Sequence, residues 1–270
     1  MSPSPLLIAI ADLALAGGRE IMAVYAQNFS ARTKDDATPV TEADEKAERI
    51  ILDGLARLEP QTPVISEEAA ASGNIPAVTE RFYLVDPLDG TKEFISRNGE
   101  FTVNIALIER GIPVLGVVYA PALHRMFVGE KGRGAAEAHT GEIAGARKLA
   151  WRPINVRKTP ADRLIVVASR SHRDDKTEQF LSGLARHDLV SAGSSLKFCL
   201  LASGEADLYP RFGRTMEWDT AAGHAVLLAA GGLVETEAGC ALSYGKTERG
   251  YDNPAFIAAT SPELMASLTK

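Results

Sequence analysis

Hydrophobic positions near the start of the chain repeat with the period of a helix. Apolar residues recur at helical spacing between residues 5 and 27, and a second stripe of this kind begins after Thr41. Thr41 and Asp44 have the spacing of a capping box, although Asp is less usual than Glu at the second position. The pattern therefore predicts two helices, separated by a polar loop at residues 30–40.

Strand patterns follow these helices. A short strand is predicted at residues 63–66, and a second apolar run leads into Asp86. Residues 101–108 and 114–119 predict an antiparallel pair, which a hairpin at 126–134 continues. The first part of the chain is thus expected to combine a helix pair with antiparallel strands.

The second part of the chain alternates strands and helices. Residues 164–168 form an uninterrupted apolar run, which predicts a strand that is covered on both faces. An apolar helix is predicted over 220–230, with Asp219 at its start. A polar junction with two prolines lies at 151–162. We therefore expect an α+β half over residues 1–155 and an α/β half over 156–270.

Composition excludes several classes of protein. Of the 270 residues, 46% are hydrophobic and 24% are charged, as in soluble globular proteins. The net charge of −6 and the absence of a basic run argue against nucleic-acid binding, and no apolar stretch is long enough for a transmembrane helix. The N-terminus lacks the pattern of a secretory signal. Cys199 and Cys240 have apolar neighbours and form no Cys-x-x-Cys pair, so we expect reduced, structural cysteines in a cytoplasmic protein. Peripheral attachment to the inner face of the cell membrane and a monomer or a homodimer all stay open.

The most informative stretch is Asp86-Pro-Leu-Asp89-Gly-Thr91. Pro87 is expected to end the strand, because proline has no N–H to donate to a ladder. Two carboxylates three positions apart would then repel each other unless a cation lies between them, and Mg²⁺ prefers such oxygen ligands. The amides of Gly90 and Thr91 open a predicted helix and suit a phosphate. Asp, Pro and Gly also form ordinary turns, so this stretch alone does not decide.

Further acidic residues extend the predicted metal site. Glu67 follows the strand at 63–66, and Asp219 precedes an apolar helix. Either residue alone is explained by a helix start, where acidic side chains are favourable. Taken together with Asp86 and Asp89, they indicate a metal site. No zinc-like spacing of His or Cys and no Gly-x-Ser-x-Gly elbow competes with it, so a metal-activated water is favoured over a covalent nucleophile.

These motifs together resemble the inositol monophosphatase superfamily of Mg²⁺-dependent, lithium-sensitive phosphatases. The resemblance rests on Ile65-Ser-Glu67-Glu68, on Asp86 to Thr91 and on Glu217-Trp-Asp219-Thr-Ala-Ala-Gly223, and it covers essentially the whole chain. Ala168-Ser-Arg-Ser-His172, Gly193-Ser-Ser-Leu-Lys197 and Ala206-Asp-Leu-Tyr-Pro-Arg211 look like the bacterial 3′(2′),5′-bisphosphate nucleotidase branch. The resemblance implies a mixed α/β fold, a layered αβαβα sandwich with the site between the two halves.

The resemblance also implies roles for single residues. Two or three Mg²⁺ ions would be held by Glu67, Asp86, Asp89, Asp219 and the backbone carbonyl of Leu88. Asp44 and Thr91 would orient the attacking water and help to deprotonate it. Substrate binding would involve the metal-site residues Glu67, Leu88, Asp89 and Asp219, the amides of Gly90 and Thr91 at the scissile phosphate, and His172, Ser194, Lys197 and Arg211 at the nucleotide and its second phosphate.

The implied activity is hydrolysis of the 3′-phosphate of adenosine 3′,5′-bisphosphate (PAP) to AMP and phosphate, with the sulfated form PAPS as a further expected substrate. This activity belongs to sulfate assimilation and PAP recycling. One alternative is an inositol-1-monophosphatase of the same fold, against which Lys92-Glu93 and Ser194-Ser-Leu-Lys197 argue. The other is a non-catalytic protein that binds nucleotide or metal, against which the complete set of acidic residues argues.

Overall fold

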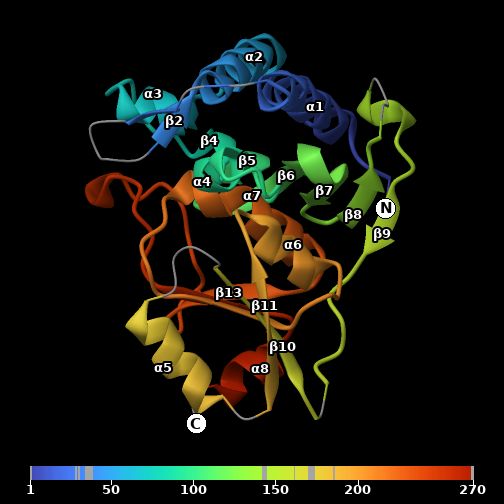
Figure 1. Cartoon of the computed structure of the whole chain (residues 1–270), viewed down its shortest axis with the longest axis vertical. Coiled ribbons are helices and arrows are strands. Elements are labelled where there is room, and N and C mark those ends of the chain that lie inside the picture. Colours follow the sequence, from blue (N-terminus) through green and yellow to red (C-terminus); the bar gives the residue numbers. More distant parts are fainter. Residues whose placement is uncertain are drawn as a thin grey trace.

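The chain folds into five stacked layers (Figure 1). The computed structural model describes residues 2–27, 29, 31–33, 39–141, 145–160, 162–169, 174–184 and 186–268. From top to bottom, Figure 1 shows a helix pair, a seven-stranded sheet, a second helix pair, a five-stranded sheet and a third helix pair. This order confirms the predicted αβαβα sandwich.

The outer helices of the first layer are α1 (Pro5–Tyr25) and α2 (Glu42–Leu58), as the apolar stripes predict. Ser4 caps α1, and Thr41 begins α2 with the predicted capping box, in which Asp44 is the third helical residue. The predicted loop at 30–40 begins and ends with short paired strands, β1 (Ala31–Thr33) and β2 (Pro39–Thr41). The capping box thus fixes Asp44 at the point where the chain enters α2.

The larger sheet has the strand order β3-β4-β5-β6-β7-β8-β9. Its strands are β3 (Val64–Ser66), β4 (Arg81–Asp89), β5 (Thr102–Glu109), β6 (Ile112–Ala120), β7 (Arg125–Glu130), β8 (Gly134–His139) and β9 (Arg152–Ile154). One expectation is wrong, because Pro87 does not end β4. The ladder with β5 instead shifts register between Asp86 and Asp89, and this bulge accommodates the missing N–H of proline.

The smaller sheet has the strand order β11-β10-β12-β14-β13 and mixes parallel and antiparallel pairs. Its strands are β10 (Leu164–Ser169), β11 (His187–Ala192), β12 (Leu208–Arg211), β13 (Leu233–Thr236) and β14 (Phe256–Ala259). Helices α5 (Asp175–Gly183) and α8 (Pro262–Ser267) form the layer below it. Val166 and Val167 are fully buried, which confirms that residues 164–168 form a strand covered on both faces.

Helices α6 (Leu196–Ala202) and α7 (Glu217–Ala229) lie between the two sheets (Figure 1). The backbone of α7 approaches β6 so closely that a side chain at Gly116 would lie 2.4 Å from the carbonyl oxygen of Ala222. One core cluster joins side chains of both sheets through α6 and α7, including Leu84, Phe198 and Val226. The division at residue 155 stays a prediction, because the two parts share this core.

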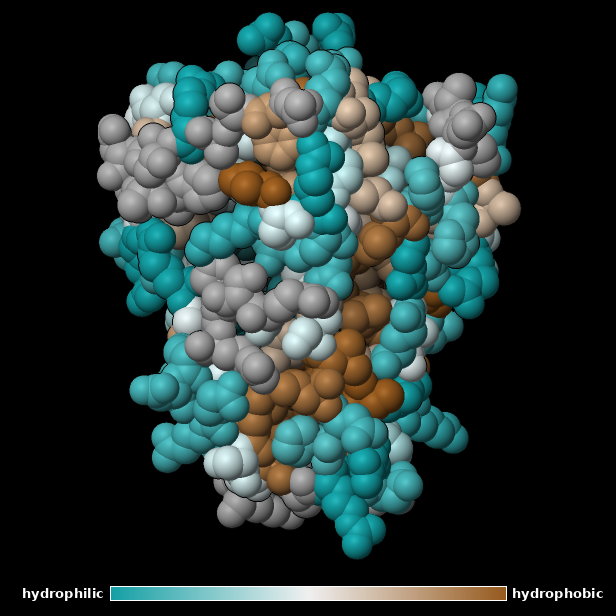
Figure 2. All heavy atoms as spheres, in the orientation of Figure 1, coloured by the Kyte–Doolittle hydropathy of each residue, from teal (hydrophilic) through white to brown (hydrophobic). Residues whose placement is uncertain are grey.

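The surface shows where sequence neighbours mislead. Cys199 is buried as expected, but Cys240 is exposed, because it lies in the turn after β13, although Leu242 two positions further on is buried in the core. On the face drawn in Figure 2, hydrophobic residues gather over the lower half, where β11 forms the sheet edge and Leu189 and Val190 are exposed.

Among the described helices, none is sufficiently long and apolar to cross a membrane.

Candidate active site

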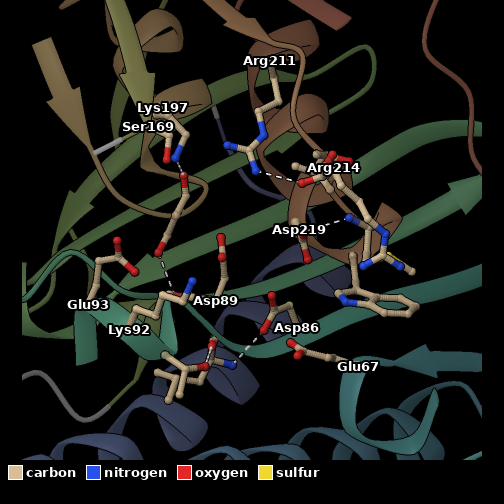
Figure 3. A pocket seen from close by; sticks show the side chains of 18 of the residues that line it. Glu67, Asp86, Asp89, Lys92, Glu93, Ser169, Lys197, Arg211, Arg214 and Asp219 are labelled. Carbon is tan, nitrogen blue, oxygen red and sulfur yellow. Dashed lines mark hydrogen bonds between the residues drawn. The ribbon is translucent and has the colours of Figure 1, made fainter. Parts of the chain in front are cut away.

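A cavity of about 480 Å³ brings together residues that are far apart in the sequence. Its lining includes every described residue that the sequence predicts for the site except Asp44, namely Glu67, Asp86, Leu88, Asp89, Gly90, Thr91, Ser194, Lys197, Arg211 and Asp219. In Figure 3 the acidic side chains point into a common space, and Lys197 and Arg211 lie on the opposite side of it. The cavity therefore has an acidic wall and a basic wall.

The bulge of β4 and the turn that follows it place two of the carboxylates. Asp86 Oδ1 accepts a hydrogen bond from the backbone N–H of Leu88 at 3.0 Å, which fixes the turn around Pro87. Gly90 then has a φ of +93°, and a Cβ atom there would lie 2.2 Å from Ser194 Oγ. Only glycine suits this conformation and this close approach. The chain can then begin α4 (Thr91–Ile95), as predicted.

Asp219 enters the site from the first turn of α7. This helix begins about one turn earlier than the sequence predicts. The helix begins at Glu217, so Asp219 is its third residue and does not precede it. Its Oδ2 accepts from the backbone N–H of Met216 at 2.8 Å, as a capping carboxylate at this position does. The other oxygen is left for the cavity. Capping and ligand binding are thus compatible for one side chain.

Burial and repulsion between carboxylates raise the pKa values of aspartates in the acidic wall. The pKa of Asp86 is raised well above its usual value, first by burial and then by Glu67 and Asp89. The pKa of Asp219 is raised in the same way by burial, Asp89 and Glu67. Burial raises the pKa of Asp89 to about 6, although the ammonium of Lys197 and a hydrogen bond from Asn104 act against it. A wall of this kind attracts a cation.

Asp44 lies behind this wall, next to Thr91. Thr91 Oγ1 lies 3.4 Å from Asp44 Oδ1 and 3.4 Å from the carbonyl oxygen of Leu88, and its single proton can be donated to either acceptor. The other oxygen of Asp44 accepts from the N–H and the hydroxyl of Thr41 at 2.8 and 2.7 Å. Burial raises the pKa of Asp44 to about 6, with Glu67 adding to the effect. The pair can therefore pass a proton from a threonine hydroxyl to a carboxylate near neutral pH.

The basic wall comes from α6 and β12. Lys197 is buried, and its Nζ donates to the carbonyl oxygens of Ser194 at 2.5 Å and Ala192 at 3.4 Å. Burial lowers the pKa of Lys197 to about 8. Arg211 Nη2 donates to the carbonyl oxygen of Arg214 at 2.9 Å. Both cations belong to the cavity and hold nearby backbone, so they are not the solvated surface charges that their sequence context alone suggests.

Two other predicted substrate contacts have different outcomes. The hydroxyl of Ser194 lies 2.8 Å from the backbone carbonyl oxygen of Asp89 and 2.9 Å from that of Glu100, and its single proton can be donated to either, so it joins the segment before α6 to the turn after β4. Its contact with substrate stays a prediction. His172 lies outside the described residues.

The sequence motifs miss several residues of the cavity. Lys92, Arg214 and Trp218 line it, and Arg214 also pairs with Asp252. Asn104 and Ser195 are buried behind the carboxylates and donate or accept hydrogen bonds among them. Lys92 and Trp218 lie inside recognised motifs, so proximity to Thr91 and Asp219 could have indicated them. Asn104 carries no local signal, because its partners Asp89 and Ser195 are 15 and 91 positions away.

The acidic wall fits a divalent cation by the chemistry of its donors. Oxygen ligands from carboxylates and a backbone carbonyl are the set that Mg²⁺ prefers. In the described parts of the chain, however, no three His, Cys, Asp or Glu side chains are arranged as a ready metal site. Neighbouring carboxylates raise the pKa of Asp86 and of Asp219, and carboxylates this close repel each other unless a cation lies between them. The donor set fits, and we expect its spacing to tighten around the ion.

Comparison with solved structures identifies the class of fold. The chain superposes on CysQ from Bacteroides thetaiotaomicron, a bacterial member of the inositol monophosphatase family, with a TM-score of 0.80 and 38% identity over 94% of this chain and 96% of that one. The inositol monophosphatase from Anabaena sp. PCC 7120 gives a TM-score of 0.75 and 26% identity over 97% and 93% of the two chains.

Comparison with sequences then gives the family. The model of the inositol monophosphatase family matches residues 2–270, and the chain belongs to this family. The 3′(2′),5′-bisphosphate nucleotidase CysQ of Salmonella typhimurium is 49% identical over 92% of this chain and 96% of its own length. The protein of the same name from Escherichia coli K12 is 47% identical over the same shares.

Proposed function

We propose that this chain is a Mg²⁺-dependent phosphomonoesterase that hydrolyses the 3′-phosphate of PAP to give AMP and phosphate. The observation that carries the proposal is the cavity with an acidic wall opposite a basic wall. PAP has two separate phosphate groups, so it needs one subsite for the reacting phosphate and one for the other. The two walls supply these subsites within a volume that is typical of ligand pockets, roughly 300–1,000 Å³.

The residues divide into two groups by the part of the substrate that they would meet. Glu67, Asp86, Asp89, Asp219 and the Leu88 carbonyl would hold Mg²⁺ at the 3′-phosphate. When bound, Mg²⁺ neutralises charge on the phosphoryl group and lowers the pKa of a bound water. Lys197 and Arg211 would pair with the 5′-phosphate through charge-assisted hydrogen bonds. The amides of Gly90 and Thr91 would bind the oxygens of the 3′-phosphate.

Asp44 and Thr91 would supply the base. Thr91 Oγ1 can donate to Asp44 Oδ1, so Asp44 can take this proton when it is ionised, above its pKa of about 6. The threonine oxygen can then accept a proton from the attacking water. The water oxygen forms the new bond to phosphorus as the bond from phosphorus to the ribose 3′-oxygen breaks, and the leaving 3′-oxygen takes up a proton from solvent. This relay fits the charge that the site holds near neutral pH.

The relatives support the nucleotidase over its alternatives. Relatives that are 47–49% identical to the chain carry the name 3′(2′),5′-bisphosphate nucleotidase, whereas the inositol monophosphatase from Anabaena is 26% identical. Inositol 1-phosphate has one phosphate group and offers no second phosphate to Lys197 and Arg211. A non-catalytic protein would not need the buried relay of Asp44 and Thr91. We expect PAPS as a second substrate, and a place in sulfate assimilation and PAP recycling in the cytoplasm.

Product analysis tests the proposal. The full chain is incubated with PAP and Mg²⁺, and the nucleotides are separated. Adenosine 5′-phosphate as the only product is the expected result, because the 3′-phosphate lies at the acidic wall. Adenosine 3′-phosphate as the product would mean that the two walls hold the substrate the other way round. No product at all would favour a binding protein.

A further inference from the structure

Asn104 and Ser195 lie behind the acidic wall and are each 1% exposed. Asn104 is on β5 of the larger sheet, directly opposite Asp86 in the ladder. Ser195 immediately precedes α6, in the helical layer between the sheets. Neither residue lines the cavity described above, so neither is placed to touch the substrate.

Hydrogen bonds through these two side chains join Asp89 to Asp219. Asn104 Nδ2 donates to Asp89 Oδ2 at 3.3 Å and to Ser195 Oγ at 2.9 Å. Ser195 Oγ in turn donates to the backbone carbonyl oxygen of Asp219 at 2.5 Å. The path runs from a carboxylate on β4 to the backbone of the first turn of α7. It therefore connects an acidic residue of the larger sheet to one of the helical layer between the sheets.

The number of protons on Ser195 and Asn104 fixes which group donates in each of these hydrogen bonds. Ser195 has one hydroxyl proton and gives it to Asp219, so it can only accept from Asn104. Asn104 must then present its NH₂ group, and the second proton of this group faces Asp89. Asn104 Oδ1 is buried and has no hydrogen-bond partner among the described residues. The amide thus leaves one polar atom unsatisfied in order to serve both partners.

We propose that Asn104 and Ser195 are positioning residues that hold Asp89 and Asp219 at a fixed separation for the metal ion. This inference rests on the proposed function only in so far as the acidic wall binds Mg²⁺. Asp219 is held twice, since Met216 fixes its carboxylate and Ser195 fixes its backbone. Outer partners of metal ligands typically contribute about 10–100-fold to metal affinity.

Mg²⁺ binding without substrate is the direct test. Titration calorimetry on the full chain compares the wild type with Ser195→Ala, Asn104→Leu and the double variant. We expect each single variant to weaken Mg²⁺ binding about tenfold or more. The double variant should be within about twofold of the weaker single variant, because both changes break the same path. Thr102→Val is the matched control, since Thr102 is buried on the same strand and its hydroxyl has no partner among the described residues.

Thermal unfolding with and without Mg²⁺ separates positioning from a purely structural role. Positioning predicts that Ser195→Ala gains less stability than the wild type on adding Mg²⁺, in addition to any fall in the metal-free unfolding temperature from the unpaired groups of Asn104 and Asp219. A structural role would lower the metal-free unfolding temperature and leave the Mg²⁺ affinity unchanged. Ser195→Ala removes a single atom, so it carries the test if Asn104→Leu does not fold.

Three results would overturn the proposal: wild-type Mg²⁺ affinity in Ser195→Ala, losses that multiply in the double variant, or an equal loss in Thr102→Val. The proposed function fails separately. If the wild type binds Mg²⁺ but does not hydrolyse PAP, while the variants bind Mg²⁺ weakly, then the positioning role stands and the substrate assignment falls.

Discussion

Asp219 shows how one side chain serves the fold and the site together. One carboxylate oxygen caps the backbone N–H of Met216, and burial next to Asp89 and Glu67 raises its pKa. Asn at this position keeps an oxygen for the cap and removes the charge. The two roles therefore respond differently to one substitution.

Asp219→Asn should lower PAP hydrolysis by roughly 100-fold or more, because a lost metal ligand removes several kcal/mol of transition-state stabilisation. Its metal-free unfolding temperature should equal or exceed that of the wild type, since one of several repelling carboxylates is gone. Phosphate release and thermal unfolding measure the two effects. Asp188→Asn, in an exposed ion pair with Arg163, is the control. Wild-type turnover in Asp219→Asn would refute the metal assignment.

Arg211 tests the basic wall. Arg211→Gln should raise the KM for PAP roughly 10–100-fold, because a hydrogen bond between charged groups is worth about 1.5–3 kcal/mol. The KM for inositol 1-phosphate should not change, since that substrate has no second phosphate. Steady-state kinetics on both substrates measures the contrast, with Arg163→Gln as the control. An equal rise for both substrates would remove Arg211 from the 5′-phosphate subsite.

At the scale of elements, the site depends on the turn that leads from β4 into α4. Gly90 has a positive φ and contacts Ser194, so this turn is where the larger sheet meets the segment before α6. Gly73 has a similar φ of +77°, but a Cβ atom there would meet nothing within 4 Å. Comparing a substitution at Gly90 with the same substitution at Gly73 therefore separates the effect of backbone strain from the effect of close packing.

Gly90→Ala should destabilise the chain by roughly 1–3 kcal/mol, because a strained backbone adds to the contact with Ser194. It should also lower kcat for PAP, since the amides of Gly90 and Thr91 move. Gly73→Ala should cost only the strain of a left-handed alanine, roughly 1–2 kcal/mol, and leave kcat unchanged. Urea unfolding and kinetics measure both. If Gly90→Ala kept the wild-type kcat, the turn would not position the phosphate.

Local signals were enough to predict most elements, but not the details that complete the site. The capping box at Thr41 and the apolar stripes of α1 and α2 act within a few residues, so the sequence displays them directly. The bulge that carries β4 past Pro87 depends on its partner β5. The link from Asn104 to Ser195 spans 91 positions, and only the packing of α6 against the larger sheet creates it. Features of that kind have no local pattern to read.

At the scale of the whole molecule, α7 joins both sheets and buries an ionisable group. His224 on α7 is 2% exposed, and its Nδ1 lies 2.9 Å from the hydroxyl of Tyr244. Burial, with the nearby charge of Lys246, lowers the pKa of His224 to about 3. The unfolded chain takes up this proton below the ordinary value of 6.5, whereas the folded chain does not until about pH 3. Stability from this group is therefore lost as the pH falls from 6.5 towards 3.

His224→Gln should remove this dependence. Between pH 7.5 and 5.0, the wild type should lose about 2 kcal/mol more stability than the variant, from about 1.4 kcal/mol per pH unit below the unfolded pKa. Urea unfolding without metal at the two pH values measures the difference, and the carboxylates of the site titrate equally in both proteins. Parallel losses in the two proteins would show that His224 accepts a proton in the folded state.

The central claim is that one cavity joins a metal-dependent reaction to recognition of a second phosphate. Phosphate release from PAP and from inositol 1-phosphate, measured side by side with Mg²⁺ and then with EDTA, tests it most directly. We predict a strong preference for PAP that disappears in EDTA. A preference for inositol 1-phosphate would contradict the role of Lys197 and Arg211, and PAP hydrolysis that persists in EDTA would contradict the role of the acidic wall.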